Sequence, residues 1–92
     1  MQFPVIDMEE TGRNIERLRV DRGLSVADVQ HYFGFEQPQS IYKWQRGVTI
    51  PTVDNLYALS CLLDVPMKDI LVPTKNKAYA SESSLRAKKW RR

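Results

Sequence analysis

The sequence predicts an all-α fold of five helices in a single domain, residues 1–73, followed by a basic tail, residues 74–92. Three observations support this prediction. Apolar residues recur at helical spacing in five stretches. Capping residues, glycines and prolines stand at the ends of those stretches, where helices begin and end. No run of four or more residues alternates cleanly between apolar and polar side chains, so no strand is predicted.

The first predicted helix covers residues 8–22. Asp7 can cap its start, with Glu10 three residues later, and Gly23 can end it. Gly12 lies within the helix and marks a place where a neighbouring element can approach closely. The apolar face of this helix is expected to contain Met8, Ile15 and Leu18.

Two short helices are predicted next, over residues 26–33 and 38–45. Ser25 and Asp28 have capping-box spacing at the start of the first, and Gly34 ends it. Pro38 suits the first position of the second, and Gly47 closes it. Phe35, in the turn between them, is expected to fill the core. The expected inward-facing residues of the pair are Val26, Val29, Tyr32, Phe33, Ile41 and Trp44.

The last two predicted helices are a leucine-rich one after Thr52 and a short one over residues 67–72. Thr52 is the N-cap of the longer helix, and Pro73 stops the short one. Cys61 has leucines on both sides and is predicted to be a core residue. The apolar residues assigned to the longer helix are Val53, Leu56, Leu59, Leu62 and Leu63.

The composition argues against several classes of function. One cysteine allows neither an internal disulfide nor a cysteine-based zinc site, and the single histidine, His31, has no metal-ligand spacing around it. No catalytic residues and no cofactor are predicted. The sequence has no apolar run of 18 residues and no signal-peptide pattern near its start, so a cytoplasmic, nucleoid-associated protein is expected.

The net charge of +3 hides two opposite regions. Residues 1–74 contain seven Lys and Arg against ten Asp and Glu, which gives −3. Residues 75–92 contain seven Lys and Arg against one Glu, which gives +6. Any contact of the fold with nucleic acid must therefore use a local patch rather than a global field.

The two short helices and their glycine-containing turn predict a helix-turn-helix unit. The outer face of the second short helix is then free to enter the major groove of DNA, and it contains no carboxylate, because Glu36 lies before it. Glutamine can pair with adenine, and lysine can donate to guanine or to a phosphate. The candidate contact residues are Gln37, Gln39, Ser40, Tyr42, Lys43 and Arg46.

The sequence also resembles the Cro/C1-type helix-turn-helix proteins, known as the XRE family, over about residues 12–71. The resemblance is in the segments NIERLRVDRGLS, YFGF, SIYKWQRG, PTVDNLYALSCLLDVP and DIL. It implies a lambda-repressor-like fold, binding to double-stranded DNA at a palindromic operator, and a homodimer. By position it implies base reading by Gln39, Ser40, Tyr42 and Lys43, and phosphate contacts by Gln37, Arg46, Val48 and Thr49.

Three positions depart from the family pattern. Val26 stands where the family often has a phosphate-binding glutamine. Gln30 stands where a small residue is common, so the two short helices are expected to pack differently. The turn before Trp44 is one residue longer than usual, which leaves the start of the following helix uncertain by one residue.

Several functions stay open at this point. The first is a transcriptional repressor that acts by occupying an operator; the alternative is a protein-interaction module, such as an antitoxin or a cofactor of another regulator or recombinase. The tail is predicted to be disordered alone, and it is either a solubilising terminus or tag remnant, an arm that touches DNA, or a helix that binds a partner. A weak homodimer is expected to use the region around Val65, Met67 and Val72.

Overall fold

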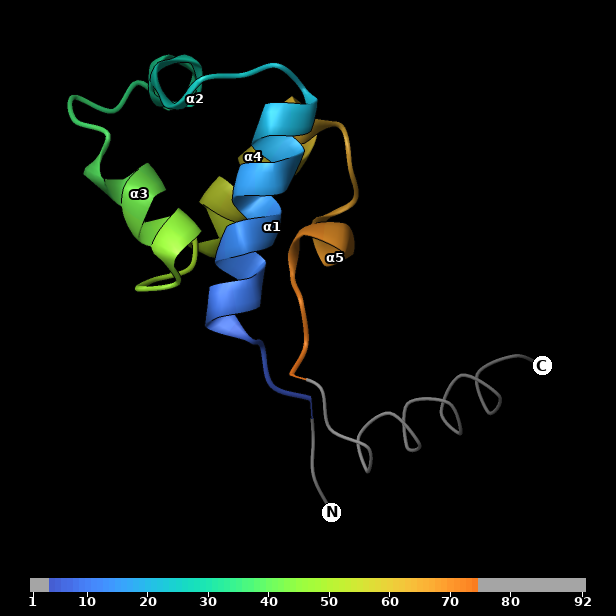
Figure 1. The fold of residues 1–92 in the computed structure, drawn as a ribbon. Coiled ribbons are helices and arrows are strands. Elements are labelled where there is room, and N and C mark those ends of the chain that lie inside the picture. The colour runs from blue at the N-terminus through green and yellow to red at the C-terminus, as the bar shows by residue number, and fades with distance from the viewer. Residues whose placement is uncertain (1–3, 75–92) are drawn as a thin grey trace.

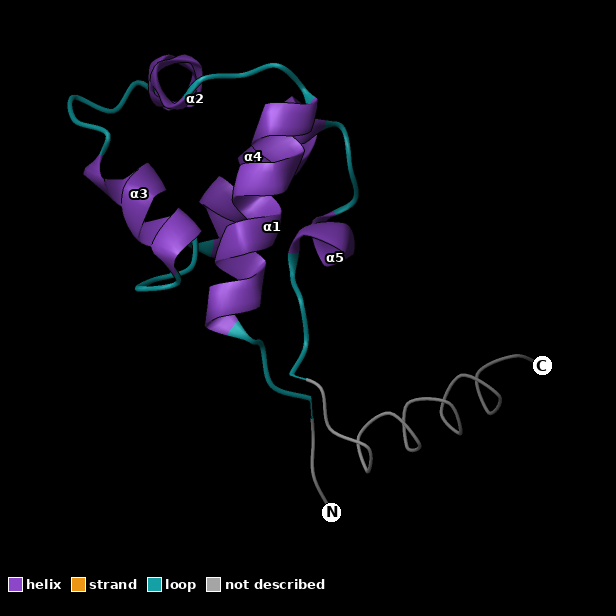
Figure 2. Ribbon diagram, in the orientation of Figure 1, coloured by secondary structure: helices purple, strands orange, loops and turns teal. Residues whose placement is uncertain are grey.

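The computed structural model describes residues 4–74, and over this range it confirms the predicted all-α fold. Figures 1 and 2 show the helices connected by short loops, with α1 lying between α3 on one side and α5 on the other. The prediction for the tail lies outside the described residues. The five helices are α1 (Met8–Asp21), α2 (Val26–Phe33), α3 (Gln39–Arg46), α4 (Val53–Leu63) and α5 (Met67–Ile70).

The predicted caps are confirmed at the starts of α1, α2 and α4. The Asp7 carboxylate accepts the Glu10 backbone N–H at 3.0 Å, and Thr52 caps α4 in the same way. At α2, Ser25 and Asp28 form a complete capping box, with bonds of 3.0 and 2.8 Å. These bonds satisfy N–H groups that have no partner inside the helix, so short helices can begin at fixed residues.

All five helices contribute side chains to the core. Phe33 and Phe35 stack with ring centroids 5.0 Å apart, and both meet Trp44 edge-on. Phe35 thus packs against the core as predicted, and the aromatic contacts hold the α2–α3 turn in place. The buried apolar residues are Ile15, Val29, Ile41, Trp44, Leu56, Leu59, Leu63 and Ile70.

The backbones of α1 and α3 approach each other closely at Gly12. A Cβ at this position would lie 2.5 Å from the carbonyl oxygen of Gln45 and closer still to that of Trp44. The predicted close approach at Gly12 is therefore confirmed. Only a glycine allows the C-terminal half of α3 to pack this closely on α1.

The prediction that Cys61 is a core residue is wrong, because its side chain is exposed. The buried residues of α4 follow the spacing i, i+3, i+4, i+7 from Leu56 to Leu63, and Cys61 lies just beyond the edge of that face. Ser60 is buried instead and donates its hydroxyl hydrogen to the Tyr57 carbonyl. Three other residues assigned to apolar faces also keep much of their surface exposed, namely Met8, Tyr32 and Val53.

Four helix boundaries differ from the prediction by one or two residues. The first helix ends at Asp21, one residue early. Pro38 is the N-cap of α3 rather than its first residue, and α3 continues to Arg46. The last helix ends at Ile70, two residues early, because the following residues adopt an extended conformation.

The extended segment after α5 pairs with the residues before α1. The Asp7 N–H donates to the Val72 carbonyl at 2.7 Å, the Thr74 N–H donates to the Val5 carbonyl at 2.8 Å, and an antiparallel bridge joins Ile6 and Pro73. The two ends of the described chain therefore lie side by side, which the sequence analysis did not predict.

Candidate nucleic-acid interface

Helix α3 has one face in the core and one in solvent. Ile41 and Trp44 are both buried, at i and i+3, and they fix the rotation of the helix about its axis. The opposite face follows the spacing i, i+3, i+4, i+7, and every side chain on it is exposed. These four residues are Gln39, Tyr42, Lys43 and Arg46, and they are named the α3 face below.

The remaining three predicted contact residues flank this face and are also exposed. Ser40 lies at its edge, Gln37 lies in the turn before α3, and Thr49 lies in the loop after it. Val48, beside Thr49, is 58% exposed. The seven residues thus lie on one helix and its two adjoining segments, while their individual roles stay predictions.

A largely buried arginine connects α1 to α3, a role that the sequence analysis missed. The Arg19 side chain is only 13% exposed. Its Nε donates to the Gln45 side chain at 2.9 Å, and an Nη donates to the Leu24 carbonyl at 2.6 Å. These bonds connect α1, the α1–α2 turn and α3. The sequence feature that could have indicated this role is Gln45, which directly follows the inward-facing Trp44.

The end of α3 is fixed by a glycine cap. Gly47 has a positive φ of 75°, and the Val48 N–H bends back to the Lys43 carbonyl at 2.9 Å. Gly47 also packs against the backbone of Met8 and Glu9, where a Cβ would lie 2.8 Å from the Met8 carbonyl oxygen. The C-terminal end of α3 therefore sits directly on the start of α1.

Positive charge on the α3 face is not neutralised by the fold. All four arginines of the α1 region pair with carboxylates, including Arg22 with Asp64 at 3.1 Å. Within residues 4–74, Lys43 and Arg46 form no ion pair. Residues 1–74 together have a net charge of −3, but α3 has a local patch of positive charge of the kind that a contact with nucleic acid would need.

Comparison with known proteins places the chain in a family. The family model described as Helix-turn-helix matches residues 15–70, which include the core and the α3 face. The chain belongs to the XRE-type helix-turn-helix family. An uncharacterized HTH-type transcriptional regulator of Sinorhizobium fredii is 34% identical over 77 residues, which cover 83% of this chain and 99% of that protein.

Solved structures with the same fold include a restriction-modification controller protein and a DNA-binding domain. The restriction-modification controller protein C.AhdI from Aeromonas hydrophila matches with a TM-score of 0.62 at 22% identity, over 70% of this chain and 96% of that one. The DNA-binding domain of BldD from S. venezulae matches with a TM-score of 0.61 at 24% identity, over 71% and 96%. At these sequence identities the similarity shows a shared fold and nothing further.

The departure from the family pattern at Gln30 has a structural role. Its side-chain amide donates to the carbonyls of Phe35 and Glu36, at 3.2 Å each. The larger side chain therefore holds the α2–α3 turn, the segment that the sequence analysis predicts to be one residue longer than the family pattern. The other departure, Val26, is partly buried against the core and has no polar group to offer a phosphate.

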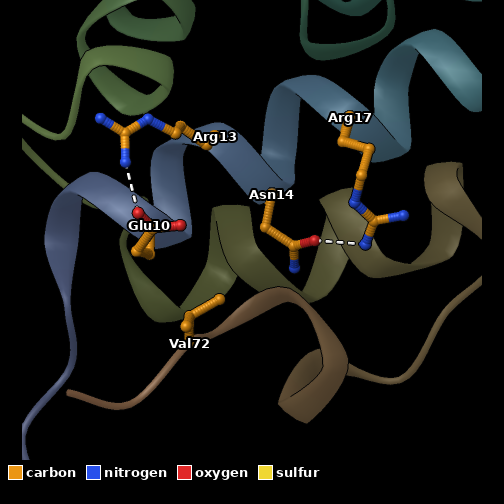
Figure 3. Close-up of a pocket in the computed structure, with 5 residues that line it drawn as sticks. All are labelled: Glu10, Arg13, Asn14, Arg17 and Val72. Atoms are coloured by element: carbon orange, nitrogen blue, oxygen red, sulfur yellow. Dashed lines mark hydrogen bonds and ion pairs between the residues drawn. The ribbon is translucent and has the colours of Figure 1, made fainter. Parts of the chain in front are cut away.

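A small open pocket lies on the other side of α1, facing the extended segment (Figure 3). Glu10, Arg13, Asn14, Arg17 and Val72 line it. Its polar groups bind one another, since Arg13 pairs with Glu10 and Arg17 donates to Asn14. We therefore assign no ligand to this pocket.

Neither a metal cluster nor a membrane span is found in the described part of the chain. No three His, Cys, Asp or Glu side chains converge among residues 4–74 in a way that could hold a metal ion. No helix in the same range is long and apolar enough to cross a bilayer.

Proposed function

We propose that this protein is a sequence-specific double-stranded DNA-binding transcriptional regulator that acts as a repressor, in the cytoplasm at the nucleoid. The observation that supports this most strongly is the α3 face. It combines an amide, a phenol and two cations with no ion-pair partner in the described part of the chain, on a helix fixed by the core. Membership of the XRE-type family and the transcriptional-regulator name of the Sinorhizobium relative support the same function.

The chemistry of the α3 face fits the major groove. Gln39 can accept from and donate to one adenine edge, and Lys43 can donate to guanine O6 and N7. Arg46 lies at the helix end, where it can reach the phosphate backbone. We assign further backbone contacts to Gln37 and Thr49, before and after α3, and contacts with a base or a phosphate to Ser40 and Tyr42.

Repression would follow from occupancy of the operator. Two copies would bind half-sites of a palindrome about one helical turn apart and exclude the polymerase. We assign the contact between copies to the α5 region around Val65, Met67 and Val72, whose apolar side chains are each partly exposed. Sedimentation should show a weak dimer that tightens on operator DNA; a tight dimer at nanomolar concentration without DNA would contradict this.

Selection of bound sequences from a random duplex library, followed by fluorescence anisotropy with the selected duplex, tests the proposal. The full chain should select a two-fold symmetric sequence and bind it more tightly as salt is lowered. Absence of binding to any duplex at low salt would overturn the proposal.

Single substitutions test the α3 face. Lys43→Ala and Gln39→Ala should each weaken operator binding about 5- to 150-fold, the equivalent of about 1–3 kcal/mol, and relax sequence preference at one base pair. Arg17→Ala is the matched control, because Arg17 is an exposed cation on α1 that belongs to neither the α3 face nor the α5 region. Equal effects of Lys43→Ala and Arg17→Ala would refute the assignment to α3.

A second candidate function is a protein-interaction module. The outer face of α4 favours it, because Val53 is 74% exposed and Tyr57 is 63% exposed, with the exposed Cys61 one turn further along. Under this function Tyr57→Arg should abolish binding of a co-purifying partner, while Lys43→Ala should leave it intact. Under the repressor function Lys43→Ala should weaken operator binding, while Tyr57→Arg should leave operator binding intact.

A further inference from the structure

An exposed carboxylate stands directly before the helix that is proposed to read DNA. Glu36 lies in the turn between α2 and α3, three residues before Gln39, and in Figure 1 this turn is the green loop that leads into α3. Within residues 4–74 the Glu36 side chain forms no ion pair. Its charge is opposite to that of Lys43 and Arg46 on the α3 face, so the fold itself does not explain it.

The backbone at Glu36 is held in place from two directions. The side-chain amide of Gln30 donates to the carbonyls of Phe35 and Glu36 at 3.2 Å each, and the Phe35 N–H donates to the Gln30 carbonyl at 3.1 Å. The Phe35 ring stacks on Phe33 and meets Trp44 edge-on. Glu36 is therefore an exposed side chain on a fixed backbone, which lowers the entropy lost when it binds.

A carboxylate beside the major groove has few favourable partners. Phosphates repel it, and so do the acceptor atoms of guanine and the O4 atom of thymine. Adenine offers an amino group, but the N7 acceptor lies next to it. Cytosine presents its N4 amino group without an acceptor beside it, which makes cytosine the base that suits a glutamate. The residues at the start of a recognition helix are also those that reach base edges.

We propose that Glu36 accepts a hydrogen bond from the N4 amino group of a cytosine and thereby specifies one C·G pair of the operator. This inference rests on the proposed function. The pair lies next to the base pairs read by Gln39 and Lys43, on the side toward the start of α3. A thymine at the same place presents an oxygen where cytosine presents its amino group, so it turns the attraction into repulsion.

The full chain is tested by changing one side chain and one base pair together. Glu36→Gln keeps the size of the side chain, removes its charge, and supplies an amide that can donate to thymine O4. Glu9→Gln is the matched control, because it makes the same chemical change at an exposed residue of α1. Thermal unfolding first establishes that both variants are folded at the temperature of the titrations. The operator selected by the parent is then titrated with the C·G pair intact and with T·A in its place.

The parent should select cytosine at this position of each half-site. It should bind the T·A duplex about tenfold more weakly than the C·G duplex. Glu36→Gln should lose this preference, whereas Glu9→Gln should keep it in full. The preferences at the base pairs read by Gln39 and Lys43 should be the same in all three proteins.

Equally tighter binding of Glu36→Gln to both duplexes would overturn this inference, because the carboxylate would then face phosphates. An operator without cytosine at this position, or a preference for C·G that survives in Glu36→Gln, would overturn it as well. Each of these results leaves the proposed function standing. If the parent binds no duplex at low salt, the proposed function fails and this inference fails with it.

Discussion

At the scale of single residues, Gly12 controls how closely α3 packs on α1. Gly12→Ala should destabilise the fold by roughly 1–3 kcal/mol, because the added methyl meets the carbonyls of Trp44 and Gln45. At an exposed helix position the same change would stabilise by up to about 1 kcal/mol, so the sign of the effect is informative. Chemical denaturation measures it, with Val20→Ala, at a position 59% exposed on the same helix, as the control. A variant as stable as the parent would show that the helices can separate at no cost.

The bond between Arg19 and Gln45 offers a second test at this scale. Gln45→Glu should stabilise the fold by roughly 1 kcal/mol, because a hydrogen bond between charged partners is stronger than one to a neutral amide. Gln37→Glu, in the exposed turn before α3, is the matched control and should give no gain. A lower melting temperature for Gln45→Glu would contradict the inference that Arg19 holds α3.

The residues also show which features could be predicted from sequence. Caps such as Ser25 and Thr52 were predicted correctly because their signals are local and involve a side chain and a backbone group three residues apart. The exposure of Cys61 was not predicted, because Cys61 lies among leucines that all suit a core. Only packing against other helices decides which side of α4 is buried. The role of Arg19 was missed for the same reason, since Gln45 is 26 residues away in the chain.

At the scale of elements, the capping box of α2 makes the stability of that helix depend on pH. Hydrogen bonds from the backbone and the side chain of Ser25 lower the pKa of Asp28 below its usual value of about 3.9. Since the folded protein binds this proton more weakly than the unfolded chain, Asp28 stabilises the fold above about pH 4. That stabilisation is lost as the pH falls through the lowered pKa.

Asp28→Asn should therefore lower the melting temperature at pH 7, and its difference from the parent should shrink as the pH falls well below 4. Thermal melts monitored by circular dichroism across this range measure the effect. Asp54→Asn serves as the control, because Asp54 lies in the first turn of α4 without a capping box. A difference that stays constant down to the lowest pH would contradict the assignment.

The helices as elements were predictable to within one or two residues, and the paired termini were not. Residues 5–7 and 72–74 are too short to show strand periodicity, and Pro73 reads only as a helix stop. Their pairing depends on α1 and α5 first placing them side by side. On the site, the sequence analysis identified seven exposed residues around α3, whose functions stay predictions.

At the scale of the whole molecule, Thr11 ties the end of the described chain to its beginning. This residue is fully buried, and its hydroxyl oxygen accepts the Val72 N–H at 2.9 Å. Thr11→Val keeps the shape but leaves that N–H without a partner, and should cost about 1–3 kcal/mol in urea unfolding. Amide hydrogen exchange at Val72 should accelerate as well. Thr11→Ser retains the hydroxyl and should keep slow exchange at Val72; equally fast exchange in both variants would contradict the role of the bond.

The pairing of Val5 with Thr74 makes the path of the backbone nearly a closed ring. A short peptide could join these two positions without disturbing any helix, and new termini could then be opened in the exposed turn at Gly23. Such a circular permutant would keep α2, α3 and their turn in one continuous segment. It would also replace residues 1–4 and 75–92 with a covalent linker, so the order of helices in the gene would become a matter of choice.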